Sequence, residues 1–194
     1  MSRKKEIVLA SSSPRRRGLL GLTGLPFTVE SSDYEEILNS GIRPRLLARR
    51  LSLAKAKAVS RKYRNAIIIA ADTFIVFGES ILGKPRSKAE ARRMLGLLSG
   101  KAHSVITGFT IMDTASGKIL SRSVETKVWF KKLSPREIVS YVGTGEPLDK
   151  AGAYAIQGLG SLIVERIEGD YFNVIGLPLS SLVEALKKFG VHVL

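Results

Sequence analysis

The sequence predicts an α/β fold in which helices flank a mixed sheet. Helical and strand-like segments alternate along most of the 194 residues, which is typical of α/β proteins. Residues 66–71 form a continuous apolar run, as expected for a strand that is buried on both faces. Segments 74–77 and 80–82, and likewise 103–112 and 118–131, are joined by short polar turns, so each pair indicates an antiparallel hairpin.

The amino-terminal segment predicts a strand at 7–10 and then a helix that could hold an anion. Ser13 and Pro14 have the residue types of an N-cap and a first helical position. Arginines 15–17 follow in the first turn, where the helix dipole disfavours each cation by about 0.3–1 kcal/mol. A phosphate at this helix end would account for them, although some could simply point to solvent.

The next stretch predicts one strand and one long helix. Residues 27–30 resemble a second strand, and 31–40 form a polar, acidic loop. From 44 to 63, apolar residues recur at helical spacing beneath a basic outer face.

The second half of the chain predicts three further helices and a strand. Ser87 and Glu90 have the spacing of a capping box, with the helix ending near 99–100. The remaining elements are a helix over 134–143, a glycine-rich loop over 145–160, a strand over 161–168 and a closing amphipathic helix over 178–189.

The composition describes an ordinary globular protein, with one domain or two tightly joined lobes. Hydrophobic residues make up 44% and charged residues 25% of the chain. The absence of cysteine excludes disulfides, thiolate catalysis and thiolate metal sites. The basic start precedes an apolar run too short for a signal peptide, and no run approaches the ~20 residues of a membrane span. We therefore expect a cytoplasmic protein that does not enter a membrane.

The positive charge is concentrated in the first third of the chain. Residues 1–64 hold 15 Lys and Arg against 5 Asp and Glu, within a net charge of +14 for the whole chain. Such a bias attracts nucleic acids, nucleotides or membrane surfaces. Aromatic residues are sparse and no nucleic-acid-binding motif is present, which disfavours nucleic acid as a partner. A phosphorylated small molecule needs only part of this charge.

Asp72 is the first candidate for chemistry, because it follows the most apolar strand. Open α/β sheets place their ligand sites at the carboxyl ends of strands. A carboxylate there could coordinate Mg²⁺ or accept a proton from water. The alternative is a turn aspartate that bonds its own backbone.

Lys84 is the second candidate. The pattern Gly78-x-x-x-x-Gly83-Lys84 imitates a phosphate-binding P-loop, but Pro85 lacks the hydroxyl and the N–H that such a loop needs. A lysine held in a tight turn could still bind phosphate. An ordinary lysine leaving a hairpin is the alternative.

Metal-assisted attack by water on a phosphate ester or anhydride is the simplest chemistry left. His103 and His192 fit no zinc spacing, and no serine lies in a nucleophile elbow. Carboxylates and substrate phosphates are the usual ligands of Mg²⁺. The acidic residues that could share a metal with Asp72 are Asp33, Glu35, Glu36, Glu146, Asp149 and Asp170. The alternative for each of them is a solvated loop residue.

Taken together, seven ordered segments resemble the Maf family of nucleotide pyrophosphatases over nearly the whole chain. They are LASSSPRR at 9–16, LxxxKA at 51–56, ADT at 71–73, GKP at 83–85, GEPLDKAG at 145–152, IQG at 156–158 and GDYFNVIGLPL at 169–179. The resemblance implies one domain over 1–194, made of two lobes with a fold related to inosine triphosphate pyrophosphatases and an active-site cleft between the lobes. It also implies hydrolysis of a nucleoside triphosphate to the monophosphate and pyrophosphate, with a divalent cation (Mg²⁺ or Mn²⁺), usually in a homodimer.

The resemblance also assigns roles to individual residues. Asp72 takes the place of the family's proton acceptor, and Glu36 would assist it at the metal or the water. The phosphates would be engaged by Lys84, which we count with the catalytic residues, and by substrate-binding residues Ser11, Arg16 and Lys55. The family commonly has Asp-Glu where this chain has Glu35-Glu36, which makes Glu36 the less secure assignment.

Three further positions separate the subgroups of the family. Arg15, Thr73 and Gln157 match the dTTP/UTP type, whereas the 7-methylguanosine triphosphate type has Trp, Gln and Glu there. A glutamine amide offers one donor and one acceptor to the pairing edge of uracil or thymine, whereas a carboxylate only accepts. An aromatic residue in place of the arginine would suit stacking on a cationic purine.

The sequence therefore predicts a hydrolase that acts on dTTP and UTP. The closest alternative is the same reaction on 7-methyl-GTP or another modified nucleotide. A different alternative is a regulatory protein of cell division or nucleic-acid binding that retains the fold.

Overall fold

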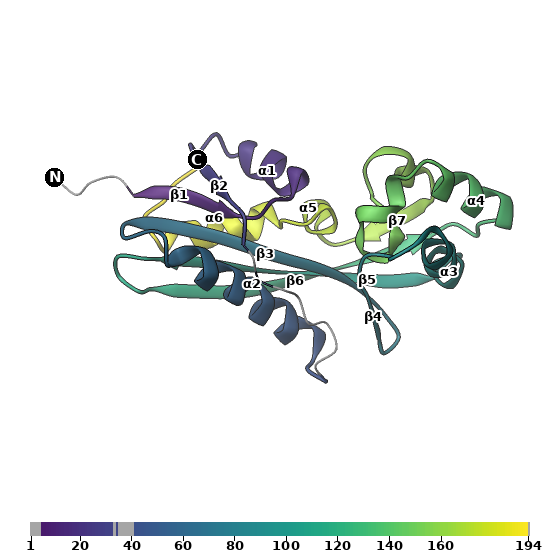
Figure 1. The fold of residues 1–194 in the computed structure, drawn as a ribbon, viewed down its shortest axis with the longest axis horizontal. Coiled ribbons are helices and arrows are strands. Elements are labelled where there is room, and N and C mark those ends of the chain that lie inside the picture. The colour runs from purple at the N-terminus through teal and green to yellow at the C-terminus, as the bar shows by residue number, and fades with distance from the viewer. Residues whose placement is uncertain (1–4, 33, 35–40, 194) are drawn as a thin grey trace. The chain divides into compact units, whose positions relative to one another are not determined.

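The computed structural model describes residues 5–32, 34 and 41–193 (Figure 1). Contacts within the chain divide it into two compact units. The first unit comprises Met1–Asp72, Thr107–Val124 and Gly176–Leu194, and the second comprises Thr73–Ile106 and Glu125–Ile175. No helix among the described residues is long and apolar enough to cross a bilayer.

The secondary structure confirms the expected α/β class. Seven strands form a sheet in the order β2-β1-β3-β5-β6-β7, with β4 paired to β3. The strands are β1 (Glu6–Ala10), β2 (Thr28–Glu30), β3 (Ala66–Phe77), β4 (Ser80–Leu82), β5 (Ala102–Asp113), β6 (Ile119–Phe130) and β7 (Val164–Glu168). The sheet is mixed, because β1 pairs in parallel with β2 and β3 whereas β4 is antiparallel to β3.

Six helices and three 3₁₀ turns accompany these strands in the described part of the chain. The helices are α1 (Pro14–Gly21), α2 (Pro44–Ser60), α3 (Lys88–Leu98), α4 (Pro135–Gly143), α5 (Tyr171–Ile175) and α6 (Leu179–Lys187). The 3₁₀ turns are η1 (Glu146–Asp149), η2 (Ala151–Ala153) and η3 (Gly158–Leu162). The first two fall in the predicted glycine-rich loop, and η3 extends past its end.

In the first unit, α2 packs on one face of β1 and β3. Alternate residues of a strand point to the same face, and residues three or four apart share one side of a helix. The cluster that results joins Val8 and Ala10 of β1 and Ala66, Ile68 and Ala70 of β3 to Ala56 and Val59 of α2. The helix also lies directly on β5, where a Cβ built on Gly108 would lie 2.1 Å from the carbonyl oxygen of Ala48.

Strand β3 corrects one expectation from the sequence. We expected the apolar strand to end at Asp72 and a separate strand to begin at Phe74, but β3 runs unbroken from Ala66 to Phe77. Asp72 is buried within this strand, and its carboxylate is bonded to Lys55. A polar residue therefore interrupts the apolar pattern without ending the strand.

Several element ends also differ from the expected ones. Ser87 caps α3 by accepting from the N–H of Glu90, but the Glu90 carboxylate accepts from the N–H of Arg86, so the capping box is incomplete. The complete box occurs at Ser134 and Glu137. Strand β7 begins at Val164 because the residues before it form η3, and the short helix α5 was not expected.

The second unit has its own hydrophobic core, with a buried histidine beside it. Fourteen buried residues from α3, α4, several strands and the 3₁₀ turns form this core. His103 lies beside it, where its Nε2 atom is 2.8 Å from the Tyr154 hydroxyl and its ring meets Phe130 edge-on. Burial lowers the pKa of His103 from 6.5 to about 4. The histidine is therefore a structural residue, as its sequence context suggested.

We expect this buried histidine to destabilise the protein in mild acid. Its pKa is lower in the folded state than in the unfolded state, so the unfolded state binds more protons between pH 6.5 and about 4. Stability is therefore full above pH 6.5 and is lost as the pH falls, by about 2 kcal/mol between pH 7.5 and pH 5.

Urea unfolding at both pH values measures this loss. The variant His103→Gln keeps a hydrogen-bonding amide but cannot titrate. Between pH 7.5 and pH 5, its free energy of unfolding should therefore fall by about 2 kcal/mol less than that of the wild type. His192→Gln, at the chain's only other histidine, which is exposed, is the control and should behave as the wild type. The same loss of stability in His103→Gln and the wild type would contradict the explanation.

Candidate active site

The strongest candidate site in the first unit is an ion pair between Lys55 and Asp72. The ammonium of Lys55 bonds the Oδ1 atom of Asp72, and both side chains are less than a tenth exposed. The pair thus places a carboxylate oxygen, which can accept a proton, next to a lysine that can bind a phosphate.

The local patterns of α2 and β3 explain why these two residues meet. Ala66, Ile68 and Ala70 face α2, and strand alternation puts Asp72 next on the same face. Lys55 precedes Ala56 on the buried side of α2, one turn before Val59. The pair therefore continues the apolar contact between helix and strand toward the carboxyl-terminal half of β3.

The segment after β1 provides a second group of polar residues in the same unit. Ser13 caps α1 by accepting from the N–H of Arg16, and Pro14 is the first helical residue, as the sequence predicted. Arg16 reaches back to the Ser11 hydroxyl at 3.4 Å and donates through Nε to the carbonyl oxygen of Gly176 at 2.9 Å. Its guanidinium is therefore held in place at the amino end of α1. Arg15 lies half-buried in the same first turn.

The other expected site residues belong to the second unit. Thr73 follows Asp72 directly on β3 and is half-buried. Lys84 is exposed just after β4, where the carbonyl oxygen of the preceding Gly83 accepts from the N–H of Gly152 at 2.9 Å. Gln157 is exposed immediately before η3. The expected residues Asp33, Glu35 and Glu36 lie outside the described residues.

The loop that carries Gln157 is fixed by residues that the sequence analysis did not identify in this role. One carboxylate oxygen of Glu146 accepts from the Tyr141 hydroxyl at 2.8 Å and from the N–H of Gly160 at 2.9 Å. The other accepts from the N–H of Leu159 at 3.1 Å. The sequence analysis considered Glu146 as a metal ligand or a solvated residue, because nothing local indicates that it contacts residues far along the chain.

The electrostatics of this cluster match its hydrogen bonds. Burial acts to raise the pKa of Glu146, but the bonds from Tyr141, Gly160 and Leu159 and the nearby Lys150 outweigh it and lower the pKa below its usual value. Burial and the Glu146 carboxylate together raise the pKa of Tyr141. Glu146 is therefore an ionised acceptor and Tyr141 a neutral donor at neutral pH.

A second unexpected cluster surrounds Asn173. Its side-chain nitrogen donates to Thr126 Oγ1 at 3.0 Å and to the carbonyl oxygen of Val105 at 3.1 Å, and its N–H bonds the Asp170 carboxylate. Asp170, another of the acidic residues expected near a metal, thus fixes the start of α5. These bonds connect α5 to β5 and β6 within the second unit.

The described residues supply few metal ligands of their own. No group of three His, Asp or Glu residues among them could hold an ion. Asp72 is a single buried carboxylate, and one or two carboxylates together with substrate phosphates are a ligand set that Mg²⁺ accepts. The donor set therefore fits a cation that is bound mainly through a nucleotide.

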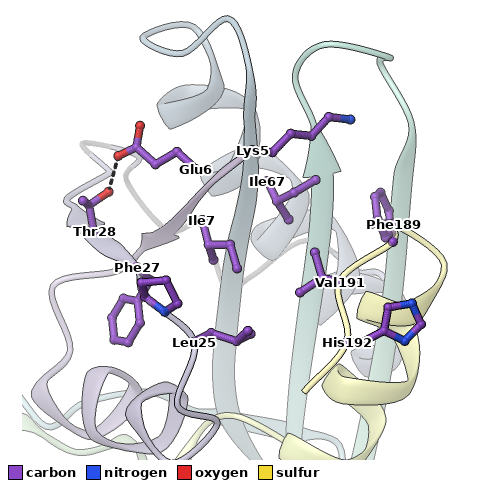
Figure 2. Close-up of a pocket in the computed structure, with 12 residues that line it drawn as sticks. Lys5, Glu6, Ile7, Leu25, Phe27, Thr28, Ile67, Phe189, Val191 and His192 are labelled. Carbon is purple, nitrogen blue, oxygen red and sulfur yellow. Dashed lines mark hydrogen bonds between the residues drawn. The ribbon is translucent and has the colours of Figure 1, made fainter. Parts of the chain in front are cut away.

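A pocket in the first unit lies at the amino ends of β1 and β3, away from Asp72. Figure 2 shows Ile7 and Phe27 on one side of it and Val191 and His192 on the other. Its volume is about 810 Å³. The pocket borders the amino ends of β1 and β3, whereas Ser11 directly follows β1 and Asp72 lies in the middle of β3. Because α/β sheets bind ligands beyond the carboxyl ends of their strands, and β1 ends at Ala10 beside this part of β3, we place the candidate site at Asp72.

Comparison with known proteins places the sequence among relatives of similar length. The model of the family described as Maf-like protein matches residues 6–189. A Methanosarcina barkeri protein named dTTP/UTP pyrophosphatase is 49% identical over 190 residues, which are 97% of this chain and 96% of that protein. Proteins of the same name from Thermoanaerobacter sp. and Bacillus anthracis are 52% and 47% identical, over 97% of this chain and 100% and 98% of theirs.

Solved structures share the fold at low sequence identity. A HAM1 protein from Coxiella burnetii superimposes with a TM-score of 0.56 at 15% identity, covering 95% of this chain and all of that one. The Ham1 protein of Staphylococcus aureus gives a TM-score of 0.50 at 16% identity, covering 96% of this chain and all of that one. These likenesses concern the fold alone.

Proposed function

Because this chain belongs to the Maf family, we propose that it hydrolyses dTTP and UTP to the nucleoside monophosphate and pyrophosphate. Its curated relatives bear the name of this activity and match it over nearly their full length. The observation in the structure that supports the chemistry best is the buried pair of Lys55 and Asp72. It provides a proton acceptor and a phosphate-binding cation in direct contact.

In the proposed mechanism, Asp72 orients a water molecule and accepts a proton from it. The water oxygen forms a bond to the α-phosphorus, and the bond from that phosphorus to the bridging oxygen of the β-phosphate breaks. Pyrophosphate leaves with the electron pair of that bond. Lys55, Lys84 and Arg16 offset the negative charge on the phosphates, while Ser11 and the amino end of α1 orient them.

Asp72 and Glu36 are the residues we propose to hold a divalent cation, Mg²⁺ or Mn²⁺. When bound, such a cation supplies charge neutralisation for the leaving pyrophosphate. The two carboxylates and the phosphates of the substrate together would provide the oxygen ligands that these cations prefer.

Base recognition is assigned to Gln157, with Arg15 and Thr73 shaping the binding site. The Gln157 amide can donate to the O4 carbonyl oxygen of uracil or thymine and accept from the N3–H beside it. Cytosine presents the reverse pattern at these two positions, so a glutamine held in one orientation distinguishes the bases. We further propose a cytoplasmic homodimer whose partner is the nucleotide rather than nucleic acid.

Pyrophosphate release from a panel of nucleotides tests this function. The panel contains dTTP, UTP, CTP, ATP, GTP and 7-methyl-GTP, each with Mg²⁺ or Mn²⁺. We expect release from dTTP and UTP only. Cytosine and adenine present the reverse pattern to a Gln157 amide held in one orientation, and Arg15 and Thr73 match the dTTP/UTP type of the family rather than the type that binds a guanine nucleotide. Preference for 7-methyl-GTP would overturn the proposed specificity for dTTP and UTP, but it would agree with the proposed hydrolysis at the α-phosphate. Release from none, with DNA binding that weakens steeply with salt, would favour the regulatory alternative.

A further inference from the structure

We propose that Glu146, together with Tyr141, is a positioning residue that holds Gln157 in place for base recognition and thereby supports the selectivity for uracil and thymine over cytosine. This inference rests on the proposed function and adds a residue to it. The observation that supports the inference lies within the second unit, where Glu146 of η1 contacts the loop around Gln157.

The chain is tied to this pair on both sides of Gln157. Before it, the N–H of Ala155 donates to the Tyr141 hydroxyl at 3.3 Å, and the same hydroxyl donates to Glu146 at 2.8 Å. After it, the N–H groups of Leu159 and Gly160 donate to the Glu146 carboxylate. A single side-chain pair therefore fixes the backbone on either side of the exposed glutamine.

The contact is also close in steric terms. Gly158 has a φ of +68°, and a Cβ built on it would lie 2.7 Å from a carboxylate oxygen of Glu146. A Cβ on Gly160 would lie 2.5 Å from the Tyr141 hydroxyl and 2.0 Å from the carbonyl oxygen of Ala155. The loop thus fits against the pair with no space for larger residues.

Selectivity depends on this fixed backbone because the Gln157 amide has to reach the pairing edge of the base. Binding groups select one ligand only when neighbouring contacts hold their position. The bonds from Ala155, Leu159 and Gly160 hold the backbone from which the Gln157 side chain extends.

Steady-state kinetics with dTTP and dCTP test the proposal in four proteins. These are the wild type, Glu146→Gln, Tyr141→Phe and the control Glu165→Gln, which changes an exposed glutamate of β7 in the same unit. In Glu146→Gln, an amide NH₂ replaces one accepting oxygen, so we expect the KM for dTTP to rise about tenfold with little change in kcat. The preference for dTTP over dCTP should fall about as much. Tyr141→Phe should change the KM for dTTP and the preference for dTTP over dCTP in the same directions but by smaller factors. The control should change neither quantity.

A double-mutant cycle separates positioning from a merely structural role. With Gln157→Ala the amide is absent, so adding Glu146→Gln should not lower the preference for dTTP further. Additive losses in the double variant, or equal loss of dTTP and dCTP turnover in Glu146→Gln, would overturn the proposal.

Amide hydrogen exchange at Leu159 and Gly160 tests the positioning without any activity. It should be faster in Glu146→Gln than in the wild type or Glu165→Gln, because the two N–H groups lose a charged acceptor. Unchanged exchange would contradict the positioning role. A wild-type chain that releases no pyrophosphate from dTTP would contradict the proposed function instead.

Discussion

Replacing Asp72 by asparagine is expected to lower kcat for dTTP by about 10²- to 10⁴-fold, because the amide cannot accept the proton of the attacking water. The substitution keeps the shape and the position on β3 and removes only the charge. Lys55 then loses its charged partner in a buried environment, so the unfolding temperature should also fall. Pyrophosphate release measures the first effect, and thermal unfolding followed by circular dichroism measures the second.

Asp113→Asn provides a matched control for this prediction. Asp113 is also a buried aspartate of the first unit that pairs with a lysine, Lys5. Although burial acts to raise its pKa, the bonds from Lys5, Ser116 and Ala115 lower it to about 2. Its loss should therefore cost stability without changing kcat. If Asp72→Asn kept near-normal turnover, or if both variants lost turnover equally, Asp72 would not be the proton acceptor.

Replacing Gly108 by alanine is expected to destabilise the first unit by at least about 3 kcal/mol, because α2 and β5 touch through their backbones there. The new Cβ would lie 2.1 Å from the carbonyl oxygen and 2.2 Å from the carbonyl carbon of Ala48. Backbone atoms cannot rotate away as the end of a side chain can, so the helix must shift. Such a shift also moves Lys55 on the same helix, and we expect turnover to fall together with stability.

Gly96→Ala is the corresponding control in the second unit. Gly96 is exposed inside α3, and a Cβ built on it meets nothing within 4 Å. Alanine is a better helix former than glycine, so this variant should be more stable by about 0.5–1 kcal/mol. Urea unfolding of the two variants and the wild type measures both effects. A Gly108→Ala protein as stable as the wild type would show that α2 does not lie on β5 as described.

The sequence alone determined those features that depend on a few consecutive residues. The N-cap at Ser13, the start of a helix at Ser134 and the hairpin between β3 and β4 follow from short-range rules and are confirmed. Helical spacing predicted part of the buried face of α2: Leu47 and Leu51 are buried, but Leu46 is exposed. Family membership was also readable, because it depends on the order of motifs and not on their positions in space.

Only the tertiary structure decided what the polar residues contact. Asp72 was expected to end a strand, but Lys55, 17 residues earlier, pairs with it and the strand continues. Glu146 was expected to be a metal ligand or a solvated residue, but it binds the loop of Gln157, whose N–H groups lie 13 and 14 residues farther along the chain. The physical reason is that a charged side chain takes whichever partner folding brings near it, whereas backbone propensity and periodicity act only over one or two turns.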